Sequence, residues 1–142
     1  MINVAKANGD QNTVAIFRGN RTSFIYGDLT VTGAITCVSV TQTSDQSIKD
    51  NIKDIDLTPI FNNVNVKSYN RTDKPELGER VGFIAQDIKK ACNDNNLPNT
   101  FTNDIILEDD TALLGLDYSR LVTVLWSKVK QLEQRIAVLE NN

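Results

Sequence analysis

Apolar and polar residues alternate in short pairs along residues 1–43, and this pattern predicts β-strands. Glycines at Gly19, Gly27 and Gly33 separate the pairs, which fits short strands with frequent turns better than a helix. The pairs are Val14 and Ile16, Phe24 and Tyr26, Leu29 and Val31, and Val38 and Val40. Because roughly forty residues of strand cannot bury a core alone, we expect them to pack against copies of the chain or against upstream sequence. The alternative is an unstructured tail.

The middle of the chain predicts a mixture of helices and strands. Ile48, Ile52 and Ile55 have helical spacing and predict a helix within residues 45–61 that Pro59 ends. Beyond it, the pattern predicts a strand at 64–66, a polar loop at 70–79, a strand at 80–85, a helix at 86–93, and a hairpin of 105–107 with 112–116.

The last segment has the apolar spacing of a coiled coil. Asp117 is expected to cap a helix that runs close to the end of the chain. Apolar residues recur along it at alternating spacings of three and four, with valine or isoleucine at heptad position a and leucine at d. They are Val122, Leu125, Val129, Leu132, Ile136 and Leu139.

The charges beside this apolar stripe predict parallel self-assembly. Lys128 and Arg135 fall at g, whereas Glu133 and Glu140 fall at e. In a parallel, in-register oligomer each g residue meets the following e residue of a neighbour, so opposite charges meet in both pairs. The a and d residue types favour two strands over three, but so short a coiled coil attached to a larger domain need not set its own number. The alternative is that the stripe packs on its own domain.

Composition removes several classes of function. A net charge of −3 argues against a nucleic-acid partner, and no apolar run predicts a membrane span or a signal peptide. The chain has no histidine, which removes histidine-based catalytic dyads and the usual zinc sites; we expect no metal and no cofactor. Cys37 and Cys92 lack the spacing of a metal or redox motif, and we predict buried free thiols in a reducing compartment.

A serine and a lysine at the junction between the β-like and mixed segments suggest a nucleophile and a base. They are Ser44 and Lys49. A lysine side chain ordinarily has a pKa of about 10.4, and lowering it by about three units requires roughly 4 kcal/mol of destabilisation of the ammonium form. Burial or a nearby cation can supply that. We therefore expect Lys49 to be inert on a solvated monomer and to become active when assembly buries it.

The spacing of the two residues limits the local geometry. Five residues of helix leave two side chains about 140° apart, and a strand puts them on opposite faces, so the segment must turn or the lysine must come from another chain. The predicted cut lies between Thr43 and Ser44, because a serine hydroxyl can attack the carbonyl of its own preceding residue. The alternative is that Ser44 or Asp45 only caps a helix at 46–55, with Lys49 on its outer face.

Three motifs follow one another along the chain: Ser44-Asp45-Gln46-Ser47-Ile48-Lys49 with Asn51-Ile52, then Gly82-Phe83-Ile84-Ala85-Gln86-Asp87, then Leu116-Asp117-Tyr118-Ser119-Arg120-Leu121. Together they resemble the endosialidase-type C-terminal intramolecular chaperone domains, which end phage tail spikes and fibres and also occur in myelin regulatory factor-type proteins. In order and spacing the resemblance covers about residues 44–140.

The resemblance implies a homotrimer that chaperones an intertwined β-structured passenger and then releases itself by single-turnover serine autoproteolysis. Ser44 matches the family's nucleophile and Lys49 its base. Residues 1–43 would be the end of the passenger, in a virion tail, while the chaperone domain acts in the host cytoplasm. Two positions depart from the family: Ser47 stands where a basic residue is common, and Asp87 stands where glutamate is usual.

We therefore predict an α+β chain with two parts. Residues 1–43 are predicted as a shaft remnant of short strands in an intertwined trimer. Residues 44–142 are predicted as the chaperone domain, a small mixed α/β unit with a parallel coiled-coil helix at about 118–140. Asp45 and Gln86 are candidate supporting residues, and the alternative for Gln86 is a helix-capping or interface amide.

Two other functions fit the sequence. One is a permanent trimerisation cap that never cuts. The other is a receptor-binding fibre tip, in which the 70–79 loop and the asparagine-rich 93–99 stretch contact a ligand.

Overall fold

The computed structural model describes residues 15–17, 23–26, 28–31, 33–106 and 110–141. The chain divides into two compact units, one ending at Lys49 and one running from Asp50 to Asn142. Each unit is described by itself. The predicted domain boundary between Thr43 and Ser44 stays a prediction.

The first unit contains one short antiparallel pair of strands, β1 (Ala15–Phe17) and β2 (Ser23–Ile25). Val14 lies outside the described residues. Within residues 28–31 and 33–45 the structure has no strand, so the strands predicted around Leu29 and Val38 do not form in the single chain. A strand needs a hydrogen-bonded neighbour, and most apolar side chains here are exposed instead. They include Leu29, Ile35, Val38 and Val40.

The single helix predicted across residues 45–61 is wrong. A short 3₁₀ turn, η1 (Gln46–Ile48), is followed by non-helical backbone up to α1 (Thr58–Asn63). Pro59 lies in the first turn of α1, where its missing N–H leaves no hydrogen bond unmade, so it begins a helix instead of ending one. The isoleucines that suggested a helical face are all exposed: Ile48, Ile52 and Ile55.

The rest of the second unit has two antiparallel hairpins and two further helices. The elements are β3 (Lys67–Asn70), η2 (Pro75–Leu77), β4 (Glu79–Gly82), α2 (Ala85–Asp94), β5 (Thr102–Ile106), β6 (Ala112–Leu116) and α3 (Val122–Glu140). Strand β3 pairs with β4, and β5 pairs with β6. The predicted loop, the strand leading into a helix and the last hairpin are confirmed to within a few residues, whereas the strand predicted at 64–66 begins only at Lys67. The α+β class is confirmed.

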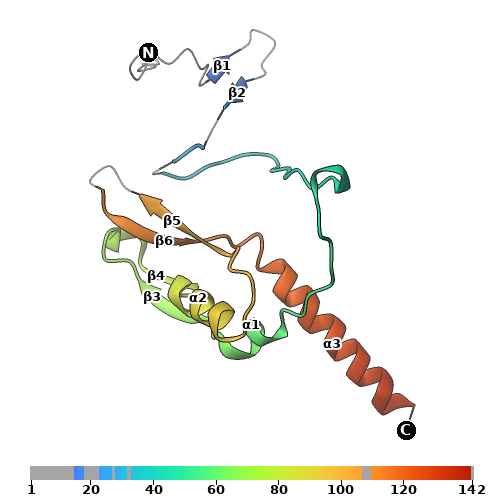
Figure 1. The fold of residues 1–142 in the computed structure, drawn as a ribbon. Helices are drawn as coiled ribbons and strands as arrows, with labels where there is room; N and C mark the ends of the chain where they lie inside the picture. The colour runs from blue at the N-terminus through green and yellow to red at the C-terminus, as the bar shows by residue number, and fades with distance from the viewer. Residues whose placement is uncertain (1–14, 18–22, 27, 32, 107–109, 142) are drawn as a thin grey trace. The chain divides into compact units, whose positions relative to one another are not determined.

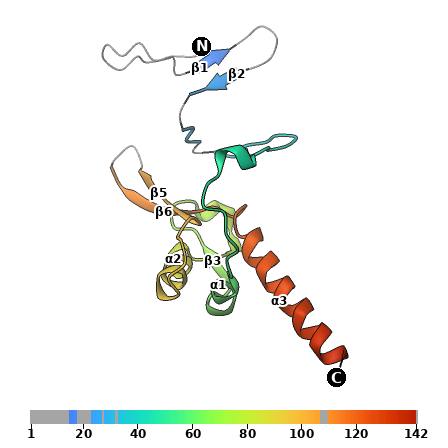
Figure 2. The same cartoon turned by 45° about the vertical axis from the view of Figure 1, so that its right-hand side comes forward.

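The core of the second unit forms where the helices meet. Helix α1 contacts both α2 and α3, and α2 contacts the β5–β6 hairpin; Figures 1 and 2 both show α1 and α2 near the start of α3. The deepest side chains are Ile60, Ile88 and Cys92. Around them lie Leu57, Phe101, Leu121 and Val124. This small core fixes the start of α3.

The two cysteines are free but differ in exposure. Cys92 is fully buried in α2, as predicted, and burial raises the pKa of its thiol. Cys37 is exposed, so the prediction that it is buried is wrong. It belongs to residues 33–45, where the structure has no strand and every residue is exposed.

Asp117 caps the turn before α3 and not the helix itself. Its carboxylate accepts hydrogen bonds from the Arg120 N–H at 3.2 Å and from the Ser119 hydroxyl at 2.6 Å. The helix starts at Val122, after this turn. From there α3 runs out beyond the small core, so that its C-terminal half projects (Figure 1).

The core predicts a clear stability difference between two substitutions. Ile88→Ala removes a side chain that is 1% exposed and should lower the free energy of unfolding by about 2–5 kcal/mol. Val81→Ala, on an exposed residue of β4, should change it by no more than about 0.5 kcal/mol. Chemical denaturation followed by circular dichroism, at one fixed protein concentration, measures both. Equal effects of the two substitutions would contradict the assigned core.

Candidate functional site

The η1 turn brings Ser44 and Lys49 into direct contact. Lys49 Nζ donates to Ser44 Oγ at 2.7 Å and to the Ser44 carbonyl oxygen at 2.8 Å. Between them the backbone turns, with the Ile48 N–H bonded to the Asp45 carbonyl at 3.4 Å and the Lys49 N–H bonded to the Gln46 carbonyl at 3.0 Å. Of the two arrangements that the spacing allows, the structure therefore has the turn within one chain. The catalytic roles of the two residues stay predictions.

Asp45 holds this turn by capping it. Its carboxylate accepts the Ser47 N–H at 2.8 Å and the Ser47 hydroxyl at 2.6 Å. The hydroxyl bond, followed by the backbone bond, lowers the pKa of Asp45 below its ordinary range. Asp45 thus caps the short η1 turn, although the helix at 46–55 that it was expected to cap does not form. Lys49, however, folds back onto Ser44 instead of extending from an outer helix face.

The Ser44–Lys49 pair is exposed in the single chain. Every residue from Gln42 to Asp50 is exposed, so the chain alone leaves both side chains in water. The 2.7 Å contact lies within the reach of proton transfer. A lysine base additionally requires surroundings that disfavour its ammonium form. The contact that a nucleophile and base require is present, while both side chains are exposed in the single chain.

Gln86 lies in the other unit. It occupies the first turn of α2 and is exposed. Its predicted supporting role in the site therefore stays a prediction, as does its alternative role as a capping or interface amide.

Two of the three sequence motifs contact each other, which the sequence alone does not reveal. The Phe83 N–H donates to Tyr118 Oη at 3.1 Å, and the two rings lie 6.2 Å apart. A Cβ at Gly82 would collide with the same Tyr118 hydroxyl, so glycine permits the close approach. This contact ties the end of β4 to the turn that leads into α3. In the sequence, Gly82 before Phe83 indicates a close approach of another group, but it does not indicate that the group is Tyr118.

The heptad stripe of α3 is not covered by its own domain. Its members are between 42% (Leu132) and 73% (Leu139) exposed. The domain instead packs on other faces of the helix, where Val124 is buried and Ser127 Oγ accepts the Leu57 N–H at 3.0 Å. The alternative in which the stripe packs on its own domain is therefore wrong for this structure. The parallel coiled coil stays a prediction.

Lys128 has partners within its own chain. Its ammonium lies 5.3 Å from the centre of the Phe61 ring and donates to Asn62 Oδ1 at 3.1 Å and Gln131 Oε1 at 2.9 Å. The predicted pair with Glu133 of a neighbouring chain must compete with these contacts.

The described residues give no sign of two other kinds of site. Among them, no group of three or more histidine, cysteine, aspartate or glutamate side chains is placed to hold a metal. No helix in the described part of the chain is long and apolar enough to cross a membrane.

Comparison with known protein families identifies the segment that contains the pair. Residues 44–99 match the family Peptidase_S74, described as "Chaperone of endosialidase". This match confirms the predicted resemblance, and it spans the motifs that start at Ser44 and at Gly82. No curated protein matches the chain.

The Asp45 cap predicts a measurable titration. Because its native pKa is lowered, Asp45 stabilises the turn above the ordinary aspartate pKa of about 3.9. That stabilisation is lost as the pH falls through the lowered native value. NMR titration of the carboxyl should place the midpoint below 3.9 and show it rising in Ser47→Ala, which removes the hydroxyl donor. Ser44→Ala should leave it unchanged; a midpoint insensitive to Ser47→Ala would refute the cap.

Proposed function

We propose that this chain, whose residues 44–99 match the chaperone of endosialidase family, is a trimeric intramolecular chaperone that cuts itself once between Thr43 and Ser44. The family match supports the intramolecular chaperone role, and the family's name, Peptidase_S74, supports a peptidase activity. The observation that carries the cleavage proposal is the 2.7 Å contact between Lys49 Nζ and Ser44 Oγ, at the first residue of the matched segment.

The proposed reaction is an acyl shift followed by hydrolysis. Neutral Lys49 takes the Ser44 hydroxyl proton, and Oγ bonds to the Thr43 carbonyl carbon. The carbon–nitrogen bond then breaks, and the Lys49 ammonium returns the proton to the Ser44 nitrogen. The product is an ester between Thr43 and Ser44 Oγ. Water hydrolyses it to a free Thr43 carboxylate and a free Ser44 hydroxyl, so each chain reacts once.

In this proposal, assembly supplies the burial that the exposed Ser44–Lys49 pair lacks. In the proposed trimer the pair becomes buried, and burial disfavours the ammonium form of a lysine. The exposed, strand-free apolar residues of the first unit then find strand partners on the other two chains. The cut therefore follows correct folding. We place the passenger in a phage tail fibre or spike and the released chaperone domain in the host cytoplasm.

The heptad stripe supports self-association over a solitary helix. Its six apolar side chains are exposed on α3, and exposed apolar surface of this extent marks an interaction site. Opposite charges at the g and e positions favour the parallel arrangement. The stripe alone does not set the number of chains, and the family resemblance is the reason for choosing three.

A second candidate is a trimerisation cap that never cuts. The observation that favours it is the Asp45 cap of η1, which gives the 44–49 segment a purely structural role. Under this reading Lys49 only tethers the Ser44 backbone.

Two substitutions separate the candidates. Lys49→Ala removes the base and should slow cleavage by about 10²–10⁴-fold, and Ser44→Ala should abolish it. Mass spectrometry of folded, purified chain should then show one full-length species, in place of fragments 1–43 and 44–142.

The matched controls are neighbouring residues of the same types. Ser39→Ala and Lys53→Ala also remove an exposed hydroxyl and an exposed amine, and both should still cut. Cleavage after Thr43 in Ser44→Ala would overturn the nucleophile. An uncut chain without substitutions, in trimers after long incubation, would favour the permanent cap.

A further inference from the structure

An apolar pocket of about 340 Å³ opens beside the start of α3. Side chains from α1, from the segment after it, from the residue after β4, from α2, and from the start of α3 with the residue before it line the pocket, and Asn65 is its one amide. The apolar lining includes Phe61, Val64, Val66, Phe83, Leu121 and Leu125. Phe61 and Val66 are 44% and 59% exposed, so apolar surface is left open to water at this pocket.

The pocket lies on one defined flank of the heptad stripe. Leu121 and Lys128 occupy successive g positions, and Leu125 occupies d. Leu121 and Leu125 line the pocket, and Lys128 lies over the Phe61 ring that also lines it. In a parallel coiled coil this g flank faces the e flank of the neighbouring helix.

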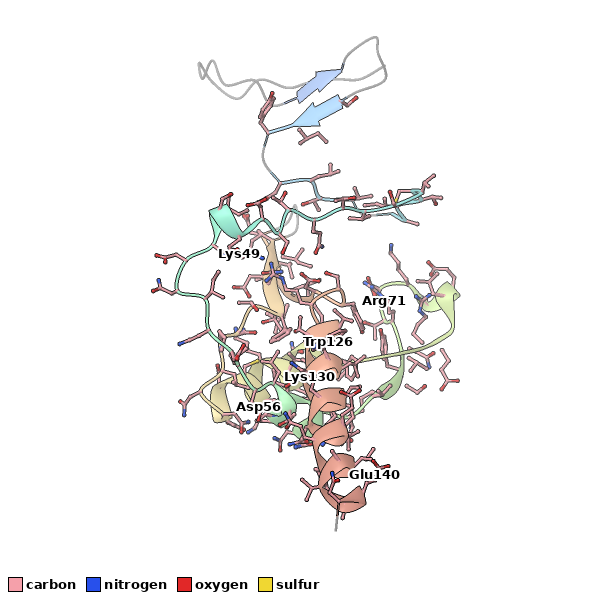
Figure 3. All side chains as sticks on the ribbon, turned by 90° about the vertical axis from the view of Figure 1, so that its right-hand side faces the viewer. Lys49, Asp56, Arg71, Trp126, Lys130 and Glu140 are labelled. Atoms are coloured by element: carbon pink, nitrogen blue, oxygen red, sulfur yellow. The ribbon has the colours of Figure 1, made fainter. Side chains whose placement is uncertain are left out.

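The first residue on the e flank is the chain's single tryptophan. Trp126 is 70% exposed, and Figure 3 shows it on the same outward side of α3 as Lys130, one turn away. A buried tryptophan side chain removes about 150–250 Å² from water. Leaving it exposed forgoes much of that stabilisation.

We propose that, in the trimer, Trp126 of one protomer fills this pocket on its neighbour. The inference rests on the proposed trimer. The register is the one that pairs Lys128 with Glu133 and Arg135 with Glu140: each g residue meets the e residue five positions on, which sets Leu121 against Trp126 of the partner protomer.

The size and chemistry of the pocket fit an indole. A closed cavity of roughly 150 Å³ already holds benzene, so 340 Å³ accommodates the larger ring system. The apolar lining matches the ring, and the Asn65 side chain offers an acceptor for the indole N–H, which usually finds a partner when buried. Three such insertions, one at each interface, fix the parallel register more firmly than the charge pairs.

The single tryptophan also reports on its own burial. In the full chain, the fluorescence maximum should move to shorter wavelength, and quenching by acrylamide should fall, as the trimer forms. Val66→Lys places a charge at the pocket without touching α3. It should reverse both changes and raise the dissociation constant of the trimer by at least about tenfold. Val81→Lys is the matched control, since Val81 is an exposed valine that does not line the pocket.

The outcomes separate this inference from the proposed function. Sedimentation gives the number of chains, and circular dichroism verifies that both variants fold. A trimer whose tryptophan keeps the emission and quenching of an exposed indole overturns the insertion and leaves the chaperone proposal standing. An equal effect of Val66→Lys and Val81→Lys also overturns the insertion. A chain that stays monomeric at every concentration overturns both.

Discussion

A lysine amine in water holds its proton, and this constraint governs the account of the whole chain. The structure brings Lys49 Nζ within 2.7 Å of Ser44 Oγ but leaves both side chains exposed. Making a lysine a base near neutral pH requires roughly 4 kcal/mol of destabilisation of its ammonium form. The single chain provides the geometry and leaves both side chains exposed. Under the proposed function, assembly would supply the burial, and the proposed chemistry would then depend on the state of folding.

The two units provide separate parts of this arrangement. In the first, the Asp45 cap on Ser47 shapes the turn that places Lys49 against Ser44. In the second, a small core around Ile60 and Ile88 fixes the start of α3 and leaves its apolar stripe exposed. The single chain thus shows the local alignment of the two side chains, and the proposed trimer is assigned their burial.

The sequence predicts those elements whose signal is local. The β5–β6 hairpin and α2 have clear apolar runs and turns, and both were predicted within a few residues. The prediction of one helix across 45–61 is wrong for two reasons. Three isoleucines have helical spacing by coincidence, on a segment that is exposed and mostly non-helical. From the sequence alone, a proline in the first turn of a helix also looks the same as a proline that ends one. The strands predicted around Leu29 and Val38 are absent from the described residues of the single chain, where a strand would need a hydrogen-bonded neighbour. For the site, spacing required a turn, but only the Asp45 cap shows how that turn is made.

The most direct test of the account measures the cleavage rate of freshly refolded chain against its concentration. If burial by neighbouring chains activates Lys49, the rate per chain should fall steeply once dilution leaves monomers. Leu132→Asp, which puts a charge in the exposed stripe, should stay uncut at every concentration, while Gln134→Asp on another face of α3 should cut normally. A monomeric chain that cuts after Thr43 at the undiluted rate would contradict the central claim.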